Sequence, residues 1–457
     1  MRRLSPLLLR VIFVFQMATS CALARSSDSL PEATLSEAML SEDGGGSYGD
    51  SACSGCGQDD CLACQPACFV GPGGRFWAHG EYLGWSVKGM YLPPLVTTAP
   101  RGNHGELGQP GTQIIFGDSK YLDEYRSGAR VELGTWLNCA GSIGLEGGWF
   151  SLADNNRRFT AESSGLLTIA RPFLNVVSNQ QDSELVGYLP TAGIALAGSG
   201  AVSGAVTVDL RSSFDGADLH LLTALCCDPG DACRPARRVN FLVGYRYLRL
   251  SEGVAIRENL YSLDPNQSQN GDSTNGNVAF IVQDLFETNN TFHGADIGFT
   301  WTCQRERWSL GLLTKLGLGG NRQQVRINGN TTQIDTATGI STTSTVSVPS
   351  DGQGNVYTGG GLLAQRTNIN PYSREILSLV PELGVTLGYQ VNCHWKATAG
   401  YTLLGWTNVV RPGDQIDTSV NAGDAKLGQN GLLPDESKPI IGASRPSFAF
   451  RDSTLWA

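Results

Sequence analysis

Apolar and polar residues alternate with a period of two through most of this chain, and that period belongs to β-strands. Between residues 377 and 391, Leu379, Leu383 and Val385 share one face, whereas Glu382 and Gly384 share the other. The same division recurs in 76–85, 128–137, 142–151, 216–225, 239–250, 292–302, 308–318 and 395–410. A last segment of this kind begins near Ser447. The sequence therefore predicts about ten strands, each long enough to cross a bilayer at a tilt.

The connections between these segments alternate strictly between short and long. The short ones are Asn138 to Gly141, Cys226 to Arg238, Cys303 to Arg307 and Asn392 to His394. The long ones are 86–127, 152–215, 251–291, 319–376 and 411–446. Tight turns at one rim and large loops at the other are typical of a membrane barrel. We therefore predict an all-β fold, an antiparallel transmembrane β-barrel of about 10–12 strands with long extracellular loops and short periplasmic turns. A soluble β-sandwich is the alternative.

The first residues are typical of an export signal. Arg2 and Arg3 precede an apolar stretch, and Ala22-Leu23-Ala24 matches a cleavage site. We predict a signal peptide over 1–24, followed by a Cys/Gly-rich periplasmic segment over 25–74 that is disordered or disulfide-bonded. The outer-membrane barrel then covers 75–457. Lipidation of Cys21 is an alternative interpretation of the same signal.

Composition limits the partners of the chain. Charged residues make up 16% of it, and the formal net charge is −9. A nucleic-acid-binding protein needs a basic surface, so nucleic acid is excluded as a partner. The expected location is the bacterial outer membrane and the expected partner is its lipid, whereas the oligomeric state stays open.

The polar face of the predicted strands carries charges of both signs. By strand parity the following side chains should face the lumen: Arg130, Glu132, Glu146, Asp218, His220, Arg246, Asp296, Lys315, Glu382 and Lys396. A water-filled or ion-paired barrel interior can hold such groups, whereas a dry sandwich core could not without a large desolvation cost. The alternative is the solvated outer face of a soluble sheet.

Tryptophans lie in the strand segments or beside their turns. Indole rings prefer the headgroup level of a membrane. We predict an aromatic girdle made of Trp77, Trp85, Trp149, Trp301, Trp308 and Trp395. Trp136 and Trp406 do not fit, because they fall on the polar side of their strands. Aromatic residues in an ordinary β core are the alternative explanation.

Twelve cysteines raise the question of disulfides or metal. The pairs at 53–56 and 61–64 are too close together for a zinc finger, and export places the chain in an oxidising compartment. Disulfides are therefore preferred to metal. The candidates are Cys53, Cys56, Cys61, Cys64, Cys68, Cys139, Cys226, Cys227, Cys233, Cys303 and Cys393. The last six lie in or beside short turns, where bonds could tie the turns together or tether the N-terminal segment.

Catalytic chemistry has little support in the sequence. Five histidines are present, and Asp218 and His220 share a strand face. No G-x-S-x-G or comparable nucleophile motif accompanies them, and lumen-facing polar residues explain them equally well. We predict that the protein is not an enzyme and that it has no cofactor and no metal site.

Several glycine-aromatic segments follow one another in a characteristic order. They are FWAHGEYLGW from Phe76, SGARVELGTWL from Ser127, GLEGGWF from Gly144, FLVGYRYLRLSEGVAI from Phe241, FHGADIGF from Phe292, WSLGLLTKLGLG from Trp308 and YTLLGWTNVVRPGDQID from Tyr401. From about residue 75 onward the chain resembles the family of putative β-barrel porins of planctomycete bacteria. The resemblance implies an outer-membrane location, contact with the barrel-assembly machinery, and a porin role without catalytic residues. The family pattern continues into a final strand, whereas PSFAFRDSTLWA stops at Trp456-Ala457, so we expect either a short last strand or a chain that continues.

Three functions follow as hypotheses. The first is passive diffusion of small polar solutes. Barrels of eight strands are filled by side chains and wide pores need about sixteen, so about ten strands leave a narrow pore or none. The second is therefore a structural or surface-interaction barrel with a plugged lumen. The third is a secreted soluble β-sandwich adhesin.

Overall fold

The protein is an all-β structure in the computed structural model. The residues described are 13–17, 76–138, 140–190, 200–229, 235–263, 278–336, 338–345, 360–365, 368–392, 395–420 and 452–456, and every structural statement below refers to them. Among them, no helix is long and apolar enough to cross a membrane. The predicted signal peptide and periplasmic segment lie outside these residues except for positions 13–17.

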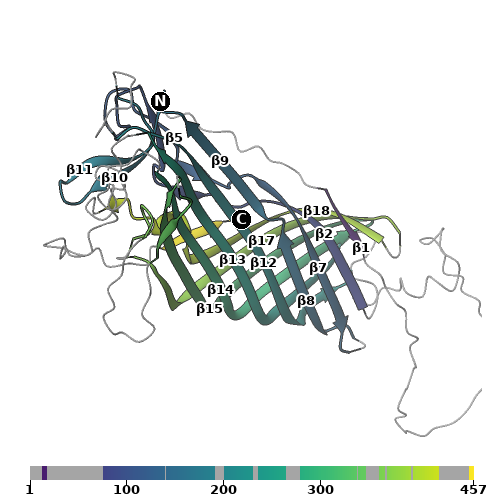
Figure 1. The fold of residues 1–457 in the computed structure, drawn as a ribbon. Helices are drawn as coiled ribbons and strands as arrows, with labels where there is room; N and C mark the ends of the chain where they lie inside the picture. The colour runs from purple at the N-terminus through teal and green to yellow at the C-terminus, as the bar shows by residue number, and fades with distance from the viewer. Residues whose placement is uncertain are drawn as a thin grey trace, which may run out of the picture.

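One large antiparallel sheet forms the wall of the molecule (Figure 1). Its main strands are β2 (Phe76–Ser86), β7 (Tyr125–Trp136), β8 (Ile143–Leu152), β12 (Val202–Asp228), β13 (Ala236–Ser262), β14 (Val278–Arg305), β15 (Trp308–Asp335), β17 (Asn370–Gln390) and β18 (Trp395–Val410). Their order in the sheet is β18-β17-β15-β14-β13-β12-β8-β7-β2, so successive main strands are neighbours. The sheet curls round on itself, which confirms the predicted all-β antiparallel barrel.

Two short strands share the remaining edge of β18. β1 (Phe13–Met17) pairs with its first residues, from Trp395 to Ala399, and β20 (Asp452–Trp456) pairs with its last, from Gly405 to Val410. β1 also contacts β2. These two segments therefore occupy the seam between the first and last long strands of the wall.

Four strands are much longer than the alternation predicted. β12 and β13 have 27 residues each, and β14 and β15 have 28. At about 3.3 Å per residue, β15 extends ~92 Å. β9 (Asn155–Ser163) extends this upper wall by pairing with β12 beyond the end of β8. Large parts of the connections predicted as loops are therefore strands.

The longer strands arise because the apolar face changes sides along each of them. On β15, Leu316 and Leu318 are exposed on the outer side. Further along, the outer side carries exposed Arg326, whereas Val325 and Ile327 are buried on the inner side. The first half of the wall thus carries its apolar side chains on the outside, and the second half carries them on the inside. The alternation continues through both, so the backbone pairing continues as well.

Smaller strands fill the upper end of the barrel. They are β3 (Met90–Leu92), β4 (Val96–Ala99), β5 (Gln113–Phe116), β6 (Ser119–Tyr121), β10 (Thr168–Asn175), β11 (Gln180–Gly187), β16 (Ser341–Thr345) and β19 (Ser419–Val420), together with the helical turn α1 (Pro412–Gln415). β11, β10, β4 and β5 form a second sheet, to which β19 adds in parallel. Figure 1 shows this group at the end of the molecule opposite the short turns. We call it the head.

An apolar core joins the head to the upper wall. Phe173 of β10 and Val186 of β11 pack with Val208 of β12 and Val254 of β13, and all four are buried.

At the centre of this core, Arg171 forms ion pairs with Glu258 and Asp284, the latter at 2.7 Å. Burial by itself would lower the pKa of Arg171, but the two carboxylates outweigh it and hold that pKa above its ordinary value. The head is therefore held by a buried charge triad as well as by apolar contact.

Candidate functional site

The lumen lies between the short turns and the head. Its lowest layer, next to the short turns, is aromatic. Trp77 of β2 and Trp136 of β7 lie with their ring centroids 4.8 Å apart, and Leu222 and Leu242 pack against them. Gly134 makes room for this, because a Cβ there would lie 2.1 Å from the indole of Trp77. All four large side chains of this layer are buried.

The middle layer is a chain of ion pairs across the lumen. Arg246 of β13 lies 2.9 Å from Asp296 of β14 and 2.6 Å from Glu382 of β17. Arg130 of β7 approaches the same Glu382 from another part of the wall, at 3.5 Å. His220 of β12 joins the other end of the chain through its Nε2, which lies 2.8 Å from Asp296. The side chains of His220, Arg246, Asp296 and Glu382 are each at most 4% exposed.

Further charges extend this layer towards β2 and β15. Lys315 lies 3.8 Å from Asp218, whose other carboxylate oxygen lies 3.3 Å from Nδ1 of His220. On the β2 side, the imidazole of His79 lies 3.4 Å from Glu132, and Glu81 lies 3.8 Å from Arg130. Charges of opposite sign alternate through the layer, which offsets part of the cost of removing them from water.

The next layer up is aromatic again. The ring centroid of Phe214 lies 5.3 Å from Phe150 and 6.3 Å from Trp406, and Trp406 in turn lies 6.3 Å from Phe292. Trp85 completes the group at 5.2 Å from Phe150. These rings come from five different strands, and all of them are buried.

The segment that follows β18 covers this aromatic layer. Arg411 donates hydrogen bonds to both carboxylate oxygens of Glu252, at 2.8 and 2.6 Å, and another to the carbonyl of Lys88. Asn290 binds both backbone groups of Val410, donating to its carbonyl at 2.8 Å and accepting from its N–H at 2.9 Å. Buried side chains thus hold residues 408–416 inside the top of the barrel.

Comparison with known proteins agrees with this architecture. A family model described as Putative beta barrel porin-7 (BBP7) matches residues 77–457. The chain belongs to this family. No curated protein and no solved structure matches it. The family is one of β-barrel porins, so the resemblance found in the sequence is confirmed at the level of the family.

The structure brings most of the predicted lumen residues of this barrel together. Arg130, Asp218, His220, Arg246, Asp296, Lys315 and Glu382 form the ion-paired layer described above. Glu132 contacts His79 at one side of it, and Glu146 accepts a hydrogen bond from the indole of Trp77 at 3.1 Å. Lys396 lies apart from this layer, half-buried near the first residue of β18.

Sequence reasoning missed several charges of the same interior. Glu81 shares strand parity with Trp77, and the parity of β13 that picked out Arg246 continues to Glu252 and Glu258. Arg411, by contrast, follows the last residue of β18 and had no strand pattern to indicate it.

The predicted aromatic girdle needs a correction. Trp77 and Trp85 are only 3% and 6% exposed and lie inside the barrel. They share a face of β2 with His79 and Glu81, whose partners on β7 are lumen charges, and that face therefore turns inward. Trp149, Trp308 and Trp395 are exposed on the outside, and Trp301 is half-exposed there.

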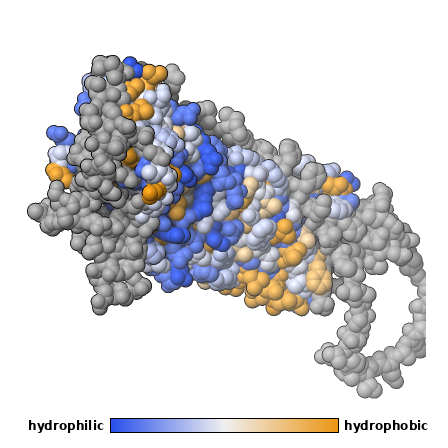
Figure 2. Space-filling model, viewed as in Figure 1, coloured by the Kyte–Doolittle hydropathy of each residue, from blue (hydrophilic) through white to orange (hydrophobic). Residues whose placement is uncertain are grey.

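The outer side of the lower wall is apolar. Figure 2 shows an apolar region at the turn end of the molecule and a hydrophilic zone between it and the head. The exposed apolar side chains include Val131, Leu133, Leu145, Leu219, Leu221, Val243, Ile297, Phe299, Leu310, Leu312, Leu316, Leu318, Leu379, Leu383, Val385 and Leu387. We call this the apolar belt. Water-exposed surfaces rarely carry an apolar patch of this extent, so the belt indicates an apolar surrounding.

The predicted disulfides fall mostly outside the described residues. Cys226 and Cys227 lie near the end of β12 and Cys303 near the end of β14, with β13 between them. The thiols of Cys226 and Cys303 are free. The remaining candidate cysteines lie outside the described part of the chain, so disulfide bonding stays a prediction. Within that described part, no group of three His, Cys, Asp or Glu side chains is placed to hold a metal ion.

Proposed function

We propose that this protein is an outer-membrane barrel with a closed lumen, which anchors its head at the cell surface. The apolar belt supports the membrane location. From Trp308 to Leu318 the belt runs ~33 Å along β15 at about 3.3 Å per residue, which a tilt of about 40° reduces to ~25 Å. That height equals the apolar band of outer-membrane barrels.

The chain of ion pairs across the lumen is the observation that carries the closed-lumen proposal. Arg130, Glu382, Arg246, Asp296 and His220 connect strands from different parts of the wall at the level of the belt. Aromatic layers lie above and below it. A solute crossing the barrel would have to separate buried ion pairs, each at a cost of several kcal/mol.

The head supports the second part of the proposal. The head and the upper wall pack together into one folded body on the side opposite the short turns (Figure 1). In a membrane barrel the longer connections face the outside of the cell. The head would then be presented at the cell surface, which is where a surface-interaction barrel needs it.

Passive diffusion of small polar solutes is the competing function, and the description of the family favours it. It would require the charged layer and both aromatic layers to move aside together. Conductance in planar bilayers separates the two functions. We expect the wild-type protein to insert without conductance steps, because ion pairs and rings block the path.

A matched pair of variants makes this test specific. Arg246→Ser with Glu382→Ser removes the centre of the lumen layer, and we expect small conductance steps from it. Arg257→Ser with Glu375→Ser removes one arginine and one glutamate from the outer side of the same two strands. We expect no conductance steps from this control variant. Wide, stable steps from the wild-type protein would instead establish passive diffusion.

A further inference from the structure

The outer face of the wall changes chemistry abruptly at the upper edge of the apolar belt. One row of paired residues contains Trp149, Tyr247, His293 and Leu377. Two residues further along each strand, the paired row contains Asp215, Arg249, Arg322 and Glu375. The spacing between rows is ~7 Å. If the belt is embedded in lipid, as the proposed function has it, the second row lies at the headgroups.

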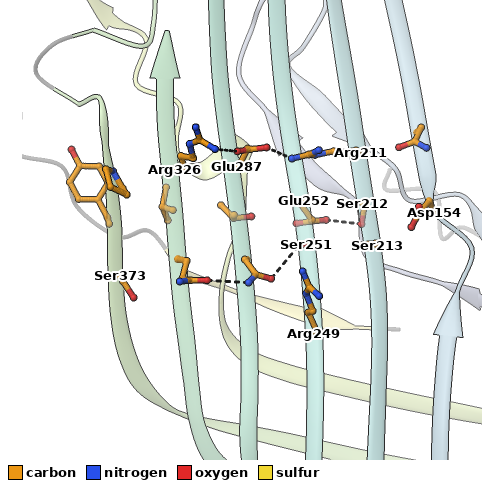
Figure 3. Close-up of a pocket in the computed structure, with 17 residues that line it drawn as sticks. Asp154, Arg211, Ser212, Ser213, Arg249, Ser251, Glu252, Glu287, Arg326 and Ser373 are labelled. Carbon is orange, nitrogen blue, oxygen red and sulfur yellow. Dashed lines mark hydrogen bonds and ion pairs between the residues drawn. The ribbon is translucent and has the colours of Figure 1, made fainter. Parts of the chain in front are cut away.

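A cleft of about 660 Å³ opens on the outer face just above this boundary (Figure 3). Small-molecule sites have volumes of about 300–1,000 Å³. Its lining consists mainly of outward side chains from two successive rows on β12 to β17, with the backbone between the rows as its floor.

Arginines of the cleft remain open to solution. In its upper row, Arg211 of β12 and Arg326 of β15 both contact Glu287 of β14, the second at 3.7 Å. Their side chains are 61% and 63% exposed, whereas Glu287 is only 22% exposed. Arg249 adds a third guanidinium at the lower edge of the cleft. Of the other carboxylates that line the cleft, Glu252 is bound by Arg411. The three arginines therefore share the cleft with Glu287 and Asp154, and positive charge remains in excess.

The lower row of the cleft is a ladder of hydroxyl and amide groups. The hydroxyl of Ser251 donates to Asn289 at 3.1 Å, and the amide of Asn289 donates to Gln324 at 3.1 Å. These bonds fix side chains that line the cleft and leave each of them further donor or acceptor capacity. Such groups bind sugar hydroxyls, whereas guanidinium groups bind phosphate in a bidentate manner.

The lack of a side chain at Gly253 allows Arg211 to reach Glu287. Gly253 lies in the register between Arg211 and Glu287, and a Cβ at this position would lie 2.6 Å from Nε of Arg211. Arg211 therefore crosses β13 over a residue without a side chain to reach Glu287 on β14.

We infer that this cleft binds the phosphorylated sugar headgroup of an outer-leaflet glycolipid. The inference rests on the proposed membrane location. The arginines would hold the phosphate, the ladder from Ser251 to Gln324 would hold sugar hydroxyls, and the acyl chains would lie along the apolar belt below. A free sugar phosphate offers the same polar groups, but only a lipid also uses the continuity between cleft and belt.

Binding can be measured by native mass spectrometry of the detergent-solubilised protein, titrated with lipid A, a phosphorylated diglucosamine lipid, and with phosphatidylcholine. We expect lipid A to bind at least tenfold more tightly. Arg211→Gln with Arg326→Gln should weaken lipid A binding by about fivefold per arginine and leave phosphatidylcholine unchanged. Gly253→Ala keeps every charge but displaces Arg211, and should weaken lipid A binding severalfold.

Arg257→Gln is the matched control, because Arg257 lies on the outer face of β13 well above the cleft, and it should bind lipid A as the wild type does. Equal affinity for the two lipids, or an equal loss with Arg257→Gln, would overturn the inference. Full competition by inorganic phosphate at the concentration of lipid A would identify free phosphate as the ligand and also overturn it. Failure of the proposed membrane location gives a different result from failure of this inference. In that case the protein would stay in solution without detergent and would bind neither lipid through the apolar belt.

Discussion

Arg130 of β7 and Glu382 of β17 meet inside the barrel with 3.5 Å between Nη2 and Oε1, although their strands belong to opposite parts of the wall. Glu382 also lies 2.6 Å from Arg246 of β13. One carboxylate therefore connects three strands that share no backbone hydrogen bonds with one another. The lumen of this barrel is cross-linked by charge.

Glu382→Ala should destabilise the barrel strongly. The substitution leaves two buried guanidinium groups without their shared partner, and breaking a buried pair in this way costs about 3–5 kcal/mol. The temperature at which the barrel loses its compact gel migration should fall accordingly. Glu375→Ala, on the exposed outer side of the same strand, should change stability by no more than about 0.5 kcal/mol. Equal effects of the two variants would mean that the ion-paired layer does not stabilise the barrel.

Gly134→Ala should disrupt the lowest layer of the lumen. The new Cβ would lie 2.1 Å from the indole of Trp77, a contact that requires the ring to move. Overpacking of this kind costs about 1–3 kcal/mol. Gly80→Ala is the control, because its Cβ would meet nothing within 4 Å and it also lies in a strand. We expect thermal unfolding to separate the two variants; an equal midpoint for both would show that Trp77 has room to move.

The period-two alternation of the sequence predicts which segments form strands and which of their side chains face the lumen. Strand segments and lumen charges such as Arg246 and Asp296 followed from period two, because side chains on one face of a strand share one environment. The same rule places Trp77 with His79 and Glu81 on the inner face of β2. For Trp77, strand parity therefore predicts the location correctly, whereas the preference of indole rings for membrane headgroups does not.

A search for strands with one continuous apolar face does not find the upper wall. Beyond Leu318 the polar residues move to the outer face and Val325 and Ile327 take the inner one, so a search for one continuous apolar face stops there. A change of phase within an unbroken alternation would have indicated strands that leave the membrane and continue in water. Contacts such as Arg411 with Glu252 depend on how the chain returns over the barrel, and no local pattern encodes that.

Arg411→Ala should release the segment that covers the aromatic layer. Arg411 makes two hydrogen bonds to Glu252 and one to the carbonyl of Lys88, and its side chain is 4% exposed. Hydrogen exchange of residues 408–416 should accelerate by at least tenfold, while the lower strands keep their protection. Arg257→Ala, which removes an exposed arginine, should leave exchange in this segment unchanged. Unchanged exchange in Arg411→Ala would show that Asn290 holds the segment alone.

Arg171→Met should make the stability of the head depend on pH. In the wild type the carboxylates of Glu258 and Asp284 hold the pKa of Arg171 above its ordinary value, so its stabilisation is fully present below the ordinary arginine pKa. We therefore expect no change from this group between about pH 5 and pH 9. Burial already raises the pKa of Glu258 in the wild type, and the variant loses the attraction to Arg171 that opposes this effect, so the pKa of Glu258 in the folded state rises further. Stability from a raised carboxyl pKa is present in acid and is lost as the pH rises through the folded value.

The head of the Arg171→Met variant should accordingly be least stable at neutral and alkaline pH and recover on acidification. Hydrogen exchange in β10 and β11, measured across this pH range and corrected for the intrinsic exchange rate, reports on the head without unfolding the barrel. Arg158→Met is the control, since Arg158 pairs with Asp209 on the exposed surface of the upper wall. A pH profile of Arg171→Met that runs parallel to that of the control would contradict the buried charge triad, because the buried carboxylate of Glu258 has lost the cation that offsets its burial and must titrate with folding.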